Sequence, residues 1–368
     1  MQNRMKLAFI SYYLTYGGIE RQITMLANEM CKRGHEVHII SMAGSRVCYD
    51  VNSGIIWHDI REKGAGLRSV WNRYCGLKKE LAKILPDITI AFMYQQVYLC
   101  AFMPKRCFGK LLYAERGDPG ADIYRGVLKM LRRITLCRID GIVFQTKGAR
   151  NYFGSKIRKK SCIIANPAFL KREDFRSITK RRNVIVNAGR LDMQKNQFLL
   201  IRAYAQVSRI YPHYTLEIYG EGNLKHELKM LAQSLGLADK IVFKGTTSNL
   251  HNEILDAGMF VLSSDFEGIP NALLEALALG IPCISTDCSP GGARELITNG
   301  EDGLIVPKGD SVKLAQAMIK FIENPDYAES LGENAARRIQ RYKPSVIYKK
   351  WEQFMMQMCS QDETRAWK

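Results

Sequence analysis

Short apolar runs alternate with amphipathic stretches along the first part of the chain. The runs that predict strands are LAFIS (7–11), EVHIISM (36–42), ITIAFM (88–93), KLLYAE (110–115) and GIVFQT (141–146). The stretches between them include predicted helices at 20–33 and 67–85. Strands that alternate with helices in this way are typical of a parallel sheet covered by helices.

The same alternation restarts in the second part of the chain. Residues 166–183, NPAFLKREDFRSITKRRN, carry Pro and many charges without a clear period and are interpreted as a linker. Predicted strands follow at 183–189, 215–220, 240–245, 259–264 and 281–286, and a last helix is predicted at 345–358. The fold class is therefore α/β, with two doubly wound domains. In such sheets ligands bind beyond the carboxyl ends of the strands, and two facing domains place a ligand in the cleft between them.

The segment FEGIPNALLEALALG (266–280) places two carboxylates around one helix. Pro270 is expected at the first helical position and Gly280 at the end of the helix. Glu267 then lies on the preceding loop, and Glu275 lies within an otherwise apolar helix. A buried carboxylate is costly unless it is paired. Glu275 either lies at a solvated edge or pairs with a core Arg, or it faces the hydroxyl groups of a ligand.

Charge is distributed unevenly along the 368 residues, whose formal net charge is +18. Residues 1–165 hold 28 Lys and Arg against 12 Asp and Glu, a net of +16, whereas the remainder holds 26 against 24. This asymmetry favours an anionic partner for the N-terminal part, such as lipid headgroups, a diphosphate or a nucleic acid. The alternative is a solubilising surface.

Composition excludes several other classes of protein. Hydrophobic residues make up 46% of the chain, as in globular proteins, and no run of about 18 apolar residues predicts a membrane span. The N-terminal residues read as a strand and a Gly-rich turn rather than a signal peptide. The ten cysteines include no C-x-x-C pair, which favours free thiols in the cytoplasm.

Two turns that follow first strands carry groups suited to an anion. Gly17 and Gly18 precede a predicted helix N-terminus, where backbone N–H groups bind anions. The absence of G-x-G-x-x-G there counts against a dehydrogenase. In the second domain Arg190 and Lys195 flank the turn NAGRLDMQKN, and two cations suit a diphosphate. The alternative is a pair of surface cations.

The groups after the second-domain strands describe a nucleotide diphospho-sugar. Glu267 suits sugar hydroxyls, and Glu275 can accept from two vicinal ribose hydroxyls. The backbone N–H groups that would face phosphate oxygens belong to Gly268, Ile269 and Asn271.

These residues resemble a known family. Glu267 and Glu275 have the E-x7-E spacing of the retaining glycosyltransferases of the GT-B fold, family 4, and SSDFEGIPNALLEALALGIPCIST resembles that family's strand–loop–helix–strand segment. GRLDMQKN at 189–196 and GGIE at 17–20 also match, in order, along essentially the whole chain.

The resemblance implies a role for each matching residue. Residues 1–166 would form an acceptor-binding Rossmann-like domain, 167–344 a nucleotide-sugar-binding one, and 345–368 a helix that crosses back to the first. Glu275 would bind the ribose and Glu267 the donor sugar, while Arg190 and Lys195 would stabilise the departing diphosphate. Further donor contacts would come from the helix N-termini at Gly17–Gly18 and 268–271 and from the loop 244–249, which includes Thr247.

The implied enzyme is a retaining glycosyltransferase of hexosyl type without a protein nucleophile. A UDP-sugar is the favoured donor and a GDP-sugar the alternative, and the acceptor is a glycan or a saccharide on a lipid diphosphate. No DxD-type pair occurs, only Asp265-Phe-Glu267, so we expect no metal ion and no cofactor.

One departure lies on the acceptor side. Where many relatives have a His, the chain reads YAERGDPG (113–120), as in relatives that build surface polysaccharides and lipid-linked glycans. Glu115, Arg116 and Asp118 are therefore acceptor-side candidates, and the alternative for them is an internal salt bridge.

A basic amphipathic stretch follows at 123–139. Its expected apolar face is Val127, Leu128, Leu131 and Ile134, and its basic face is Arg125, Lys129 and Arg132. Such a helix either lies on an anionic membrane or is an ordinary domain helix. With KIRKK (156–160) it makes a peripheral contact at the inner face of the cytoplasmic membrane plausible.

Two other classes of function compete with the transferase. A nucleotide-sugar epimerase would share the architecture but needs no acceptor site, which the basic N-terminal part disfavours. A non-catalytic membrane- or nucleic-acid-binding protein would explain the charge but not the four residues of the donor site. No RRM or zinc-finger pattern supports a nucleic-acid partner.

Overall fold

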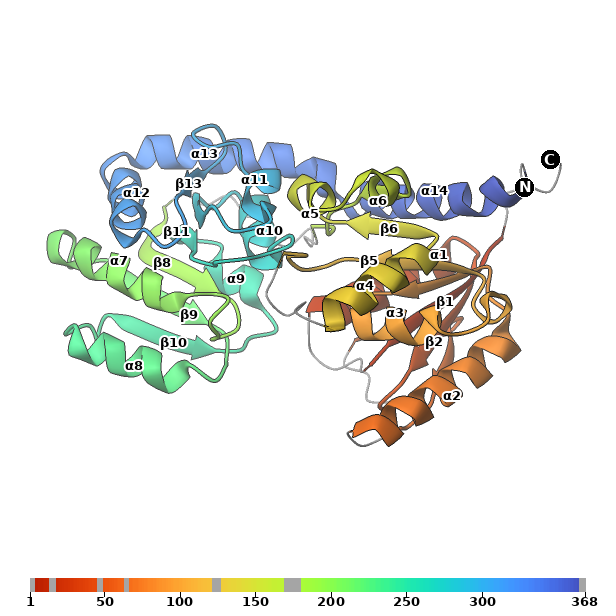
Figure 1. The fold of residues 1–368 in the computed structure, drawn as a ribbon. Coiled ribbons are helices and arrows are strands. Elements are labelled where there is room, and N and C mark those ends of the chain that lie inside the picture. Colours follow the sequence, from red (N-terminus) through yellow and green to blue (C-terminus); the bar gives the residue numbers. More distant parts are fainter. Residues whose placement is uncertain are drawn as a thin grey trace. The chain divides into compact units, whose positions relative to one another are not determined.

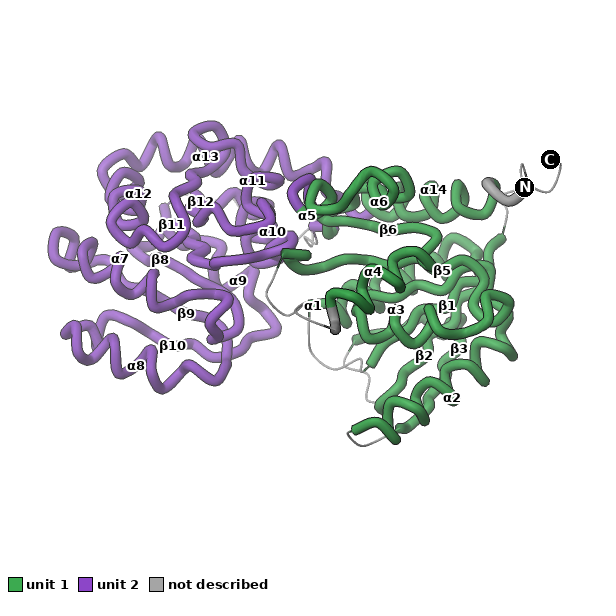
Figure 2. The backbone as a smooth tube through the Cα atoms, viewed as in Figure 1, with its two compact units in different colours: residues 1–145, 149–166, 345–368 green, residues 146–148, 167–344 purple. Residues whose placement is uncertain are grey.

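The chain forms two compact units. The structure is a computed structural model that describes residues 4–12, 18–44, 49–62, 66–120, 127–168 and 180–363. Unit 1 comprises Met1–Gln145, Ala149–Asn166 and Ser345–Lys368, and unit 2 comprises Thr146–Gly148 and Pro167–Pro344 (Figure 2). Each unit has one parallel sheet with helices along its outside (Figure 1).

Unit 1 contains a seven-stranded sheet in the order β3-β2-β1-β4-β5-β6-β7, in which every neighbouring pair is parallel. From β1 the chain builds outward to β3, then returns to the other side of β1 and continues from β4 to β7. The strands are β1 Lys6–Ser11, β2 Glu36–Ser41, β3 Ile56–Asp59, β4 Ile88–Ala91, β5 Lys110–Ala114, β6 Gly141–Phe144 and β7 Ser161–Ile163.

Helices connect these strands and bury their apolar faces. They are α1 Gly18–Lys32, α2 Gly66–Ile84, α3 Tyr94–Ala101, the 3-10 turn η1 Lys105–Cys107, α4 Val127–Arg138, α5 Lys147–Asn151 and α6 Ser155–Lys159. The central strands are buried along their length, as a parallel sheet covered on both faces requires.

The last helix, α14 (Pro344–Glu363), packs on unit 1 rather than on the unit that precedes it in sequence. Trp351 is buried and stacks with Phe92 at 6.1 Å between ring centroids. The buried Glu352 accepts a hydrogen bond from Arg33 Nη1 at 2.7 Å and lies 3.1 Å from His35 Nε2. An apolar contact and an ion pair thus fix the C-terminal helix to the first unit.

Unit 2 contains a six-stranded parallel sheet in the order β10-β9-β8-β11-β12-β13. The strand order again reverses in the middle of the sheet, because β9 and β10 lie on one side of β8 whereas β11, β12 and β13 lie on the other. The strands are β8 Arg182–Ala188, β9 Thr215–Tyr219, β10 Ile241–Gly245, β11 Ala257–Leu262, β12 Cys283–Thr286 and β13 Leu304–Val306.

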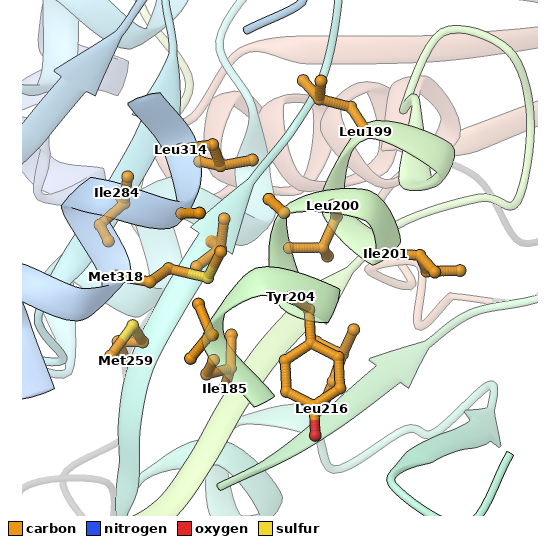
Figure 3. Packing of buried hydrophobic residues seen from close by; sticks show 14 of the residues in the cluster. Ile185, Leu199, Leu200, Ile201, Tyr204, Leu216, Met259, Ile284, Leu314 and Met318 are labelled. Carbon is orange, nitrogen blue, oxygen red and sulfur yellow. The ribbon is translucent and has the colours of Figure 1, made fainter. Parts of the chain in front are cut away.

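The core of unit 2 lies between this sheet and its helices. Figure 3 shows Ile185, Leu216 and Met259 from the sheet packed against Tyr204 and Met318 from helices. The Tyr204 hydroxyl remains satisfied because it donates to Tyr214 O at 2.8 Å. The helices are α7 Gln197–Ile210, α8 Lys225–Ser234, α9 Leu250–Ile254, α10 Asn271–Ala278, α11 Gly292–Leu296, α12 Ser311–Glu323, α13 Pro325–Arg338 and the 3-10 turn η3 Ile339–Tyr342.

The expected fold class is confirmed: two Rossmann-like halves and a C-terminal helix. Of the segment expected to be a linker, residues 169–179 lie outside the described part of the chain, and its last two residues, 182 and 183, already belong to β8. The short strands β3, β7 and β13 were not predicted.

Candidate active site

Two loops of unit 2 meet between β8 and β11, where the strand order of the sheet reverses. The loop 189–196 follows β8 and the loop 263–270 follows β11, and these strands are neighbours in the sheet. Ser263 Oγ donates to Lys195 O at 2.9 Å, and Asp265 N donates to Gln194 O at 2.9 Å. The junction is a topological switch point, the place where open α/β sheets bind ligands.

Lys195 and Glu267 form an ion pair at this junction. Lys195 Nζ donates to Glu267 Oε1, and Ser264 Oγ donates to the same oxygen at 2.9 Å. Glu267 is only 7% exposed, so its charge depends on these two donors. Among the described residues both bonds fall on Oε1.

Close backbone approaches fix the position of Glu267. Its N–H donates to Ser289 O at 2.7 Å, which ties the loop 263–270 to the segment after β12. A Cβ built on Gly292 would lie 1.7 Å from Gly268 O, so only glycine permits this packing. The Glu267 backbone is therefore held by neighbouring loops before any ligand binds.

Glu275 lies inside α10, as its position in the sequence predicts, and is 8% exposed. Its Oε2 lies 3.2 Å from His251 Nε2 at α9, a partner that the sequence did not suggest. Gly280 ends the helix with a φ of 70°, as expected. The expectation for Pro270 is wrong by one position: it precedes the first helical residue, Asn271.

Arg190 shares its loop with Lys195 but points elsewhere. Its exposed guanidinium lies 3.2 Å from Asp192 Oδ2 and donates to Gln194 Oε1 at 3.4 Å. Among the described residues no ion pair joins it to Glu267. The two predicted cations are therefore on one loop, but only Lys195 contacts the central carboxylate.

The other predicted donor residues belong to several segments of the two units. Gly268 and Ile269 are buried immediately before Asn271, the first residue of α10. Thr247 Oγ1 donates to Glu253 Oε1 at 2.5 Å and accepts from Asn249 N at 3.0 Å, so its hydroxyl stabilises the turn. In unit 1, α1 begins at Gly18, and Gly17 lies outside the described residues.

The acceptor-side candidates occupy the end of β5 in unit 1. The buried Glu115 lies 3.5 Å from Arg132 Nη2 and accepts from Gly117 N at 3.2 Å. Burial raises the pKa of the Glu115 carboxyl, an effect that Arg132 opposes. The alternative of an internal salt bridge thus applies to Glu115, with a partner that the sequence did not suggest.

Arg116 and Asp118 lie in different surroundings from Glu115. The Arg116 guanidinium lies over the rings of Phe92 and Trp351, at 4.9 and 5.3 Å from their centroids, and donates to Asn166 Oδ1 at 3.2 Å. Burial lowers the pKa of Arg116 to about 10. Asp118 Oδ1 accepts from Gly120 N at 2.8 Å.

The two faces expected for 123–139 are not those of α4. Arg132, expected on the basic face, is buried, bonded to Tyr94 Oη and donating to Pro119 O at 2.6 Å. Ile134, expected on the apolar face, is exposed, as is Met130. Arg125 and the side chains of Val127 and Leu128 lie outside the described part.

His251 and Ser264 are site residues that the sequence did not single out. His251 follows the loop 244–249 by two positions, and Ser264 precedes Glu267 by three. The available signal for Ser264 was a polar residue at the carboxyl end of the predicted strand 259–264. His251 had none, because its contact with Glu275 arises from the packing of α9 against α10.

The described residues contain neither a candidate metal site nor a helix able to span a membrane. No group of three or more His, Cys, Asp or Glu could hold a metal ion there. Across the same residues, every helix is too short or too polar to cross a bilayer. Metal independence stays a prediction.

The fold is shared with proteins of known structure. The structure of the Anabaena protein Alr3699/HepE with UDP and glucose matches with a TM-score of 0.80 and 18% identity, covering 96% of this chain and 100% of that one. Sucrose-phosphate synthase from Thermosynechococcus elongatus matches with a TM-score of 0.82 and 17% identity, covering 97% and 100%. The two Rossmann-like units therefore define a GT-B fold.

The chain belongs to the family 4 glycosyltransferases. Residues 16–172 match the model described as Glycosyltransferase Family 4, and residues 171–338 match Glycosyl transferases group 1. A similar protein, from Campylobacter jejuni, is a GalNAc-alpha-(1->4)-GalNAc-alpha-(1->3)-diNAcBac-PP-undecaprenol alpha-1,4-N-acetyl-D-galactosaminyltransferase, 26% identical over 94% of this chain and 97% of the relative. The chain is a glycosyltransferase, and the epimerase and binding-protein alternatives are set aside.

Proposed function

We propose that this enzyme transfers a sugar from a UDP-sugar, with retention of anomeric configuration, to a saccharide carried on a lipid diphosphate during surface-glycan assembly. The observation that carries the proposal is the meeting of Lys195 and Glu267 at the switch point of unit 2. The named acceptor of the Campylobacter jejuni relative and the UDP-bound Anabaena structure support the acceptor and donor classes.

Lys195 and Arg190 are the proposed partners of the diphosphate. The Lys195 ammonium has three donors, and Glu267 Oε1 accepts from one of them. A diphosphate can therefore bind Lys195 without removing it from the junction. Arg190 is exposed on the same loop, so its planar guanidinium can move from Asp192 to a phosphate group. Both cations would stabilise the charge that develops on the departing nucleotide.

The carboxylates are proposed to hold the sugars of the donor. Glu267 Oε2 would accept from the transferred sugar while Oε1 keeps its two donors. Glu275 would accept from the ribose hydroxyls, with His251 orienting its carboxylate from the other side. The N-termini of α1 at Gly18 and α10 at Asn271 would add positive potential near the phosphates.

The reaction is proposed to require neither a metal ion nor a protein nucleophile. The bond from the anomeric carbon to the diphosphate breaks, and the acceptor oxygen bonds to that carbon on the same face. Its proton passes to the departing phosphate. Glu115 is a weak candidate for a base, because Arg132 and Gly117 engage its two oxygens. Arg116 and Asp118 are proposed to contact the acceptor, on the cytoplasmic side of the membrane.

The test is a transfer assay with UDP- and GDP-sugars and a lipid-diphosphate saccharide. We expect release of UDP, an alpha product from an alpha donor by NMR, and full activity in EDTA. Arg190→Ala should lower the rate, whereas Arg209→Ala, at an exposed Arg on α7, should not. Transfer from GDP-sugars alone, an inverted product, or activity that EDTA abolishes and Mn²⁺ restores would each refute the corresponding part.

A further inference from the structure

The first two turns of α2 expose large apolar side chains. Leu67 is 90% exposed and Trp71 is 65% exposed, and Val70 between them is also exposed. Farther along the helix Leu77 and Leu81 are buried against the unit 1 core. The N-terminal half of α2 therefore buries Ser69 on one side and exposes Leu67, Val70 and Trp71 on the other, at the edge of unit 1 (Figure 1).

These side chains form one continuous surface. Leu67, Trp71 and Tyr74 are spaced four and three residues apart, which places them on one side of the helix. The rings of Trp71 and Tyr74 stack at 5.5 Å between centroids. Tyr74 Oη donates to Phe102 O at 3.3 Å, which brings in Phe102, itself 58% exposed. We call Leu67, Val70, Trp71, Tyr74 and Phe102 the α2 surface.

Basic residues surround the α2 surface. Lys78 continues the row of Trp71 and Tyr74 by one turn, Arg68 lies beside Trp71, and Arg106 follows Phe102 on an exposed segment. Among the described residues no ion pair joins any of these three cations to an acid. The nearby acids are occupied: Glu80 pairs with Lys83 at 2.7 Å, and Glu62 accepts from Asn72 at 3.3 Å.

We propose that the α2 surface docks the enzyme on an anionic lipid membrane. Trp and Tyr bury an apolar body and keep a polar tip in water, so they suit the headgroup boundary. Exposed Leu and Phe add apolar area, and unpaired Lys and Arg attract anionic headgroups. A protein partner is less favoured, because the bordering charges that make no ion pair or side-chain hydrogen bond among the described residues are all cations. The inference adds a membrane contact to the proposed function, whose lipid-linked acceptor lies in that membrane.

The experiment measures sedimentation of the full chain with vesicles of phosphatidylglycerol and phosphatidylcholine, without donor or acceptor. We expect binding that weakens with salt and is absent on pure phosphatidylcholine. Leu67→Ala/Trp71→Ala should weaken binding at least about tenfold. The matched control, Ile210→Ala/Met230→Ala, removes two exposed apolar side chains of unit 2 and should bind like the parent. Equal melting temperatures establish that all variants fold.

Three outcomes overturn the proposal. The first is a parent that binds no vesicle. The second is Leu67→Ala/Trp71→Ala binding like the parent, above all if Met130→Ala/Ile134→Ala on α4 abolishes binding instead. The third is a parent dimer that the α2 variant dissociates, which would assign the surface to a second copy of the chain. Transfer to a water-soluble acceptor is measured in parallel: if it persists while vesicle binding fails, the docking inference falls and the proposed function stands.

Discussion

The ion pair between Lys195 and Glu267 offers the sharpest test of the candidate site, because it links stability and activity. Lys195→Met removes the cation and leaves Ser264 as the side chain that donates to the Glu267 carboxylate. Glu267→Gln leaves the ammonium without its carboxylate. The double variant removes both charges and leaves no uncompensated ion.

The expected magnitudes follow from burial. Removing one partner of a fully buried pair costs about 3–5 kcal/mol. Because Lys195 keeps 16% of its side-chain surface exposed, we expect about 2–3 kcal/mol for each single variant. For a unit of this size that lowers the melting temperature by roughly 4–12 °C. In the double variant a coupling of about 2 kcal/mol should restore part of this loss.

The assay is a double-mutant cycle by urea unfolding, with transfer rates measured on the same four proteins. Stability should recover in the double variant, whereas activity should not, because the proposed diphosphate and sugar contacts are both missing. Lys225→Met, which breaks the exposed Lys225–Glu221 pair, is the control and should cost under about 0.5 kcal/mol. Additive single effects, or transfer that recovers with stability, would refute the reasoning.

Three further predictions concern other groups. Glu275→Ala should weaken UDP affinity by about tenfold or more, through loss of a charged hydrogen-bond acceptor, and an unchanged Kd by calorimetry would exclude the ribose role. Burial lowers the pKa of the His38 imidazole below its ordinary 6.5, so His38 is protonated in the unfolded chain before it is protonated in the folded one as pH falls. The free energy of unfolding in urea titrations should therefore decline as pH falls through 6.5, and His38→Gln should lack this pH dependence. A pH dependence that the variant keeps would exclude His38 as its source. Glu352→Ala should cost about 3 kcal/mol in urea unfolding, because its partners Arg33 and His35 lose a buried carboxylate, and a loss under about 1 kcal/mol would contradict that ion pair's role.

The sequence predicted the central strands and the edge strand β10 but missed the edge strands β3, β7 and β13. β1, β4, β8 and β11 are buried apolar runs whose pattern is visible without a partner. β3, β7 and β13 are three or four residues long and only partly buried. Each of these three strands forms because a neighbouring strand offers its backbone, and that information is absent from the short segment itself.

The site was predictable as far as chain order defines it. Lys195 and Glu267 follow strands that a doubly wound sheet makes neighbours, so their proximity follows from topology. The contact of His251 with Glu275 depends on how a five-residue helix packs, which no local pattern encodes. The prediction for Arg132 was wrong for a different reason. An Arg on an amphipathic helix is usually solvated, but here Tyr94, Pro119 and Glu115 from other segments bind its guanidinium inside unit 1.

The attachment of α14 to unit 1 also sets the order in which the chain can be completed. Arg33 and Glu352 are 319 positions apart, so a ribosome adding about 5–20 residues per second releases the second roughly 15–65 s after the first. All of 167–344 is synthesised within that interval. Unit 1 is therefore begun before unit 2 and completed after it, and the nascent chain carries Phe92 without Trp351 throughout the synthesis of unit 2. A protein fused after α14 would therefore be attached to unit 1, not to unit 2, whose residues directly precede α14 in the sequence.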